Sequence, residues 1–192
     1  AGSGNSGQGG IILISAGETT DAATGGHITI ESGTSTQTTS GKIEIKTTNA
    51  GIAGESGQII MLSGTSSYGN SGSIAIRSGT ARNGRGGSVY VTVGSGTSGS
   101  GGELLLSAGL SLSGTGGRVS ILSGVGTSGS SGSLLIRTSD AGLSGVSGML
   151  VLSTGTSSSG NSGALYIGTG AATQGRGGSV YVTVGSGTSG SG

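Results

Sequence analysis

The sequence predicts an all-β fold, a parallel β-solenoid, from three observations. Apolar and polar residues alternate in short runs, such as 42–45 and 88–93. These runs recur with a period of about 15 residues along the whole chain. Nearly every run follows a Gly, and the chain contains no Pro. Alternation is the period of a half-buried strand, and a fixed short period is typical of a solenoid.

The composition alone would indicate a flexible linker. Of the 192 residues, 48 are Gly, 38 are Ser and 23 are Thr. Chains rich in Gly and Ser usually behave as random coils. A linker, however, has no reason to keep Ile, Leu and Val in register over its whole length, so the periodicity favours an ordered chain.

The repeats are defined by the Gly that precedes each run. Twelve repeats follow, and three of them, beginning at residues 10, 41 and 132, carry one extra residue. The opening glycines are Gly10, Gly26, Gly41, Gly57, Gly72, Gly87, Gly102, Gly117, Gly132, Gly148, Gly163 and Gly178. Gly supplies the positive-φ corners that tight turns need, so each repeat is expected to be one strand followed by a Gly/Ser/Thr loop.

A longer period groups the repeats into modules. The segment 87–101 recurs identically at 178–192. We therefore divide the chain into the end of a preceding repeat (1–9), a first six-repeat module (10–101) and a second (102–192), within one continuous solenoid. Solenoids normally end in atypical capping repeats. None is visible, which indicates a segment of a longer array.

Stacked repeats would bury two apolar columns. One repeat per rung is favoured because it places Glu31 beside Lys46, and Glu103 beside Arg118, as opposite charges on neighbouring strands. Two repeats per turn is the alternative. The residues predicted to stack in the core are Ile28, Ile30, Ile43, Ile45, Ile74, Ile76, Val89, Val91, Leu104, Leu106, Val119, Ile121, Leu150, Leu152, Val180 and Val182. The next inward position is small or hydroxylated, as in Ser32 and Thr138.

Several outward positions are also apolar. A column of exposed apolar side chains is a candidate contact surface, although it could equally pack on the chain's own loops. The candidate lateral-contact residues are Ile60, Leu62, Leu105, Leu122, Leu135 and Val151. Open strand edges would add end-to-end stacking, so the expected partner is the chain itself.

The composition excludes most classes of site. Cys is absent and His27 is the single histidine, so no thiolate or histidine cluster can hold a metal. Eight Lys and Arg against seven Asp and Glu give a formal charge of +1, which provides no footprint for nucleic acid. No apolar run is long enough to span a membrane. We expect no enzyme activity, no catalytic residue, no cofactor and no metal site.

Two sets of charged residues are candidate sites. Glu18, Asp21 and Glu31 suggest Ca²⁺, but no other repeat carries such acidic spacing, so calcium is not expected. Arg82, Arg85 and Arg176 fall on loops, where solvated charges are the ordinary case. The many loop Ser and Thr are potential acceptors of O-linked glycans if the chain is secreted.

The chain resembles Gly/Ser/Thr-rich β-solenoid repeats of the kind predicted in secreted and surface proteins of algae and other microbes. The residues that carry the resemblance are Gly-Gly-Ser-Val-Tyr-Val-Thr-Val-Gly-Ser-Gly-Thr at 86–97 and 177–188. The resemblance implies a structural or surface role, with an extracellular or cell-surface location.

The function expected from these observations is structural. The chain would be a repeat segment of an extracellular filament, appendage or adhesive fibre that assembles through stacked β-rungs. The alternative is a solenoid that binds ice or a glycan on a flat face. Ice binding would need a regular Thr array, whereas Thr92 and Thr183 are isolated in their columns.

Overall fold

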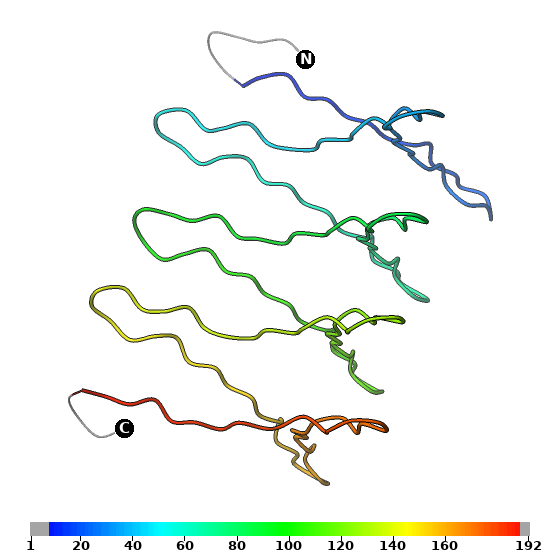
Figure 1. Ribbon diagram of the computed structural model, residues 1–192. Helices are drawn as coiled ribbons and strands as arrows, with labels where there is room; N and C mark the ends of the chain where they lie inside the picture. The colour runs from blue at the N-terminus through cyan, green and yellow to red at the C-terminus, as the bar shows by residue number, and fades with distance from the viewer. Residues whose placement is uncertain (1–7, 189–192) are drawn as a thin grey trace. The chain divides into compact units, whose positions relative to one another are not determined.

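A computed structural model describes residues 8–188, and this part of the chain contains no helix and no strand (Figure 1). The predicted all-β parallel β-solenoid is therefore wrong, both with one repeat per rung and with two repeats per turn. The implication of a β-solenoid that came from the resemblance fails with it. The protein is a chain of low regular structure, which divides into two units, Ala1–Thr92 and Val93–Gly192.

The hydrogen bonds explain why the extended runs do not count as strands. Among the described residues, backbone amides and carbonyls pair in five places, and each bond joins residues two to nine positions apart. None of these bonds joins the alternating run of one repeat to that of another. A strand exists only when a neighbour accepts and donates along its length. The alternation specifies an extended backbone with two faces, but it does not supply that neighbour.

The period of the sequence is nevertheless present in the backbone as a series of sharp bends. Within residues 8–188, eleven three-residue bends are spaced by 15 or 16 residues. The two 16-residue spacings fall in the repeats that begin at Gly41 and Gly132, which carry an extra residue. The bends are 21–23, 36–38, 52–54, 67–69, 82–84, 97–99, 112–114, 127–129, 143–145, 158–160 and 173–175.

Glycine occupies the corner of several bends for a conformational reason. Gly54, Gly69, Gly99, Gly145 and Gly160 have positive φ, and each is the third residue of its bend. Side chains disfavour this region because Cβ meets the backbone. The expectation that Gly provides the corners is thus confirmed at these five positions.

Each loop closes at a narrow point that we call its neck. The neck consists of the residue that ends one run, which is Ala, Ser or Thr except at Val93, and the Gly that opens the next repeat. At four necks a backbone bond closes the loop, for example from the Gly41 amide to the Gly33 carbonyl at 2.9 Å. In every pair below, a Cβ on the glycine would lie within 3.6 Å of the partner's side chain. The pairs are Ala16–Gly26, Ser32–Gly41, Thr47–Gly57, Ser63–Gly72, Ser78–Gly87, Val93–Gly102, Ala108–Gly117, Ser123–Gly132, Thr138–Gly148, Thr154–Gly163 and Thr169–Gly178.

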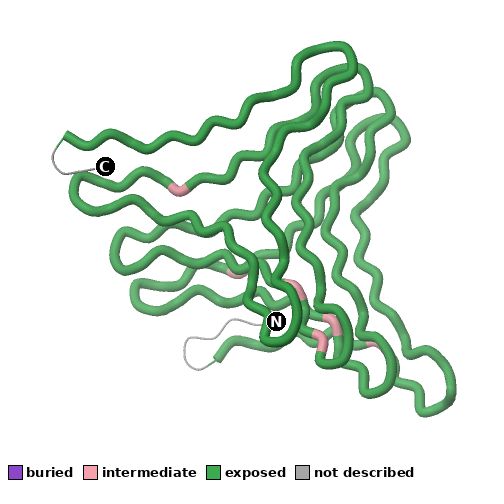
Figure 2. Tube along the Cα trace, turned by 90° about the horizontal axis from the view of Figure 1, so that it is seen from below, coloured by how far each residue is buried: buried purple, intermediate pink, exposed green. Residues whose placement is uncertain are grey.

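The necks are also where side chains are least exposed. No described residue is buried, and Figure 2 shows an exposed trace with a few half-buried positions. The half-buried residues are Ala16, Thr47, Ser63, Ala108, Ser111 and Thr138, and all except Ser111 belong to necks. The order in each unit is therefore local to its loops and does not come from a hydrophobic core.

Candidate functional site

The largest chemical feature of the chain is its exposed apolar surface. The first predicted core column, Ile28 and its equivalents, has a nearly constant exposure, from 50% at Ile28, Ile43 and Val89 to 57% at Val119. This regularity follows from the repeat, because each residue of the column lies in the same place between opening Gly and neck. Their stacking in a core stays a prediction.

The second column and the outward residues are more exposed still. Ile30, Ile45, Ile76, Val91 and their equivalents in the second column are all exposed. Among the candidate lateral-contact residues, exposure runs from 62% at Val151 to 86% at Leu122, with Ile60, Leu62, Leu105 and Leu135 between them. Contact of these side chains with another copy also stays a prediction.

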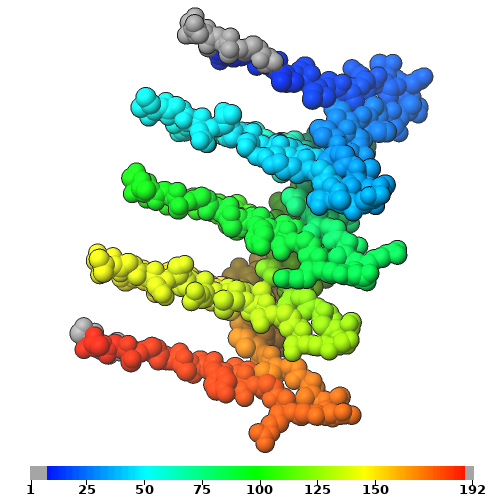
Figure 3. Space-filling model, turned by 45° about the horizontal axis from the view of Figure 1, so that its top comes forward, coloured from blue at the N-terminus to red at the C-terminus, as the bar shows by residue number. Residues whose placement is uncertain are grey.

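Both faces of the alternating runs are thus open to solvent in the isolated chain. Figure 3 shows open space between the successive rows that the chain forms in each unit, which agrees with the absence of buried residues in the described part. A soluble chain seldom leaves so much aliphatic surface exposed, and large exposed apolar patches mark interaction sites. The alternating runs of the repeats are therefore the candidate functional surface.

A cluster of three charges interrupts this surface in one repeat. Lys42 Nζ donates a hydrogen bond of 2.6 Å to Glu44 Oε2, and Lys46 Nζ contacts the other oxygen, Glu44 Oε1. These two hydrogen bonds, with that of Lys42 the stronger influence, lower the pKa of the Glu44 carboxyl below its ordinary value. Residues two apart on an extended backbone share a face, which is why the three charged side chains meet. Ile43 and Ile45, which alternate with them in the sequence, belong to the opposite face.

The Lys42–Glu44–Lys46 cluster was missed by the sequence analysis. The sequence predicts the pairs Glu31–Lys46 and Glu103–Arg118 between neighbouring rungs, whereas the ion pairs of the described residues join Glu44 to Lys42 and Lys46 of its own run. The signal was nevertheless present, as Lys-x-Glu-x-Lys at a spacing of two. This spacing was not taken as a signal because charged residues were expected to pair between neighbouring strands.

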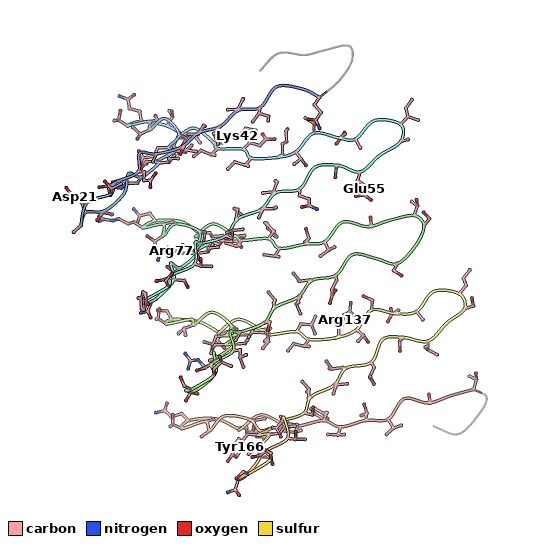
Figure 4. All side chains as sticks on the ribbon, turned by 180° about the vertical axis from the view of Figure 1, so that it is seen from behind. Asp21, Lys42, Glu55, Arg77, Arg137 and Tyr166 are labelled. Carbon is pink, nitrogen blue, oxygen red and sulfur yellow. The ribbon has the colours of Figure 1, made fainter. Side chains whose placement is uncertain are left out.

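Within residues 8–188, no ion pair joins charged residues other than Lys42, Glu44 and Lys46. In the first unit, Figure 4 shows Asp21, Lys42, Glu55 and Arg77 on separate segments, with side chains that do not converge. The part of the chain that the structure describes has no group of three or more acidic or His residues placed to hold a metal ion. It also has no pocket. Glu18, Asp21, Glu31 and His27 are all exposed.

Over residues 8–188, no helix has the length and apolar character that a membrane crossing requires.

Comparison of this chain with protein-family models, with curated proteins and with solved structures finds no match in any of the three.

Proposed function

We propose that the chain is a structural repeat segment that associates with further copies of itself through the apolar side chains of its alternating runs. The observation that supports this function is that no described side chain is buried, although Ile, Leu and Val recur in register along the chain. Fully burying one such side chain contributes about 1.5–3 kcal/mol. A single copy obtains little of this free energy, because its runs remain open on both faces.

A second copy fits this surface for two reasons. Every copy presents apolar residues at the same spacing of about 15 residues, so two copies can match over many repeats at once. The formal charge of +1 on 192 residues provides little electrostatic repulsion between copies. Exposing this apolar surface to water is unfavourable in free energy, and association of two copies would remove part of it from water.

The proposal includes the setting of the assembly. We place it outside the cell, as part of an extracellular filament, appendage or adhesive fibre. The Ser and Thr of the exposed loops would be available to O-linked glycans, while the apolar runs would be covered by other copies. The support is the exposure of these loops in the described residues together with their hydroxyl-rich composition.

The experiment is sedimentation velocity of the full chain over a wide range of protein concentration, followed by electron microscopy of the same samples. The proposal expects the average sedimentation coefficient to rise with concentration and elongated assemblies to appear. Binding of a dye that fluoresces on apolar surfaces should fall as the assemblies form. A chain that stays monomeric and dye-binding at the highest concentration would contradict the proposal.

A further inference from the structure

The bend at 82–84 carries a chemically reactive pair of residues, Asn83 followed by Gly84. Both are exposed. The other asparagines of the described residues, Asn49, Asn70 and Asn161, are followed by Ala or Ser. A side chain on the following residue hinders approach of its backbone nitrogen to the asparagine amide, and Gly has none. Arg82 and Arg85 stand on either side of this pair.

The backbone nitrogen of Gly84 is also free to react. Within the described residues, the Gly84 amide donates no hydrogen bond. The equivalent glycine of the bend at 112–114 is different, because the Gly114 amide donates a hydrogen bond of 3.0 Å to Ser111 Oγ. The residue in the position of Ser111 is Ala81, whose methyl group cannot accept a hydrogen bond; it lies 4.0 Å from where a Cβ on Gly84 would be.

From these two features we propose that Asn83 is a site of spontaneous deamidation. The Gly84 backbone nitrogen loses its proton to solvent base and attacks the Asn83 side-chain carbonyl carbon. A bond forms between these two atoms, the carbon–nitrogen bond of the side-chain amide breaks, and ammonia leaves with a proton taken from water. Water then opens the resulting five-membered imide at either carbonyl, which yields aspartate or isoaspartate. No oxidant, reductant or metal takes part.

The chain contains its own control at the equivalent position of the second module. Gln174 and Gly175 belong to the bend at 173–175, and both are exposed. The three residues that follow are Arg-Gly-Gly in both modules, whereas Thr173 stands where the first module has Arg82. Gln174 differs from Asn83 by one methylene group. Attack by the Gly175 nitrogen would have to close a six-membered ring, which is slower than closure of the five-membered ring. Conversion is therefore specific to the first of the two bends.

Deamidation changes the charge of the loop as well as its backbone. The new carboxylate lies between Arg82 and Arg85 in the sequence, and the formal charge of the chain falls from +1 to zero when Asn83 is converted. Isoaspartate additionally adds a methylene group to the main chain at the bend. This inference does not depend on the proposed self-association, since it concerns the covalent chemistry of one exposed loop.

The test is incubation of the full chain at neutral and mildly alkaline pH, followed by chymotryptic digestion and mass spectrometry. Cleavage after the four tyrosines places Asn83 in the fragment 69–90 and Gln174 in the fragment 167–181. Fragment spectra separate Asn83 from Asn70, which shares its peptide, and an isoaspartyl-specific methyltransferase assay measures the isomer. Three chains are compared: the unchanged protein, Asn83→Gln and Ala81→Ser.

The unchanged protein should gain one mass unit at Asn83 well before Asn70, Asn161 or Gln174, and faster at the higher pH. Asn83→Gln should lose most of the isoaspartate signal. Ala81→Ser, which offers the Gly84 amide the acceptor that Ser111 offers Gly114, should slow the conversion. Conversion of Asn83 no faster than that of Asn70, or a rate unchanged by Ala81→Ser, would overturn the proposal.

Discussion

Thr169 and Gly178 close one loop of the second unit through a side chain, because Thr169 Oγ1 donates a hydrogen bond of 3.1 Å to the Gly178 carbonyl oxygen. A Cβ on Gly178 would lie 3.2 Å from the Thr169 methyl carbon, so the two residues are already in close contact. Other necks close through a backbone amide, as at Gly41 and Gly33. A hydrogen bond thus closes both kinds of loop, with a side-chain hydroxyl as donor at Thr169 and a backbone amide as donor at Gly41.

Thr169→Val should loosen this neck without changing its shape. Valine keeps the methyl contact but loses the hydroxyl, and a hydrogen bond of this kind contributes about 0.5–1.5 kcal/mol, toward the low end at an exposed site. Amide hydrogen exchange measured by NMR should become faster around Thr169 and Gly178. Thr154→Val is the matched control, because the contact of Thr154 with Gly163 is made by its methyl group and Cβ. Equal effects of the two substitutions would show that the hydroxyl contributes nothing.

Gly117→Ala should open the neck at Ala108. The new Cβ would lie 3.0 Å from the Gly109 nitrogen and 3.1 Å from the Ala108 Cβ, so the backbone must move. The hydrogen bond from the Gly117 amide to the Gly109 carbonyl, now 2.9 Å, would lengthen. Exchange of the residue 117 amide should then be faster. Gly116→Ala is the control, since its Cβ would make only an ordinary contact of 3.9 Å with the Gly109 oxygen. Slow exchange retained in Gly117→Ala would refute the steric argument.

The Glu44 carboxyl should titrate below its ordinary pKa of 4.5, mainly because of Lys42 and secondarily because of Lys46. A lowered pKa means that the charge cluster is complete above the ordinary pKa and is lost as the pH falls through the lowered value. Following the Glu44 carboxyl carbon by NMR should show this midpoint. Lys42→Ala should raise it more than Lys46→Ala, and added salt should also raise it because exposed charges are screened. A midpoint insensitive to Lys42→Ala would remove the basis of the cluster.

Leu122→Lys should weaken self-association. The Leu122 side chain is 86% exposed, so the isolated chain loses no internal packing when it is replaced. An assembly that covers this position would lose the burial of one leucine and gain a charge to desolvate. Sedimentation velocity should show association shifted to higher protein concentration. Ser120→Lys adds the same charge to the same run without removing apolar surface, and it should have the smaller effect. The reverse order would argue against contact through Leu122.

The sequence predicts the period of the structure better than it predicts the fold. The bends are spaced by 15 residues, or by 16 where a repeat carries an extra residue, as the spacing of the opening glycines predicts. Gly99 takes the positive φ that a corner needs. The solenoid was inferred from Ile43 and Ile45 alternating with charged residues, but alternation is the same in a paired and an unpaired extended run. Pairing requires that ladder bonds and burial outweigh the entropy of ordering the backbone, and a chain so rich in Gly loses more entropy than most on ordering.

The sequence predicts the apolar positions of the candidate site but not its charge cluster. The sequence predicts Leu122 as an outward apolar position and Ile28 as a core position, and both are exposed in the described chain. The stacking of Ile28 and the contact through Leu122 stay predictions. The Lys42–Glu44–Lys46 cluster was missed because its contacts lie within one run, whereas a solenoid predicts contacts between runs. Local geometry along an extended backbone could have found it from the spacing alone.

The necks have a mechanical consequence. Each loop is closed by contacts between the end of one run and the Gly that opens the next. A force that pulls the two ends of a unit apart therefore acts on several separate necks, each held by a few contacts. When one neck opens, the residues of its own loop become free to extend, while the other necks stay closed. We therefore expect such a unit to lengthen in small steps under tension and to shorten again in small steps.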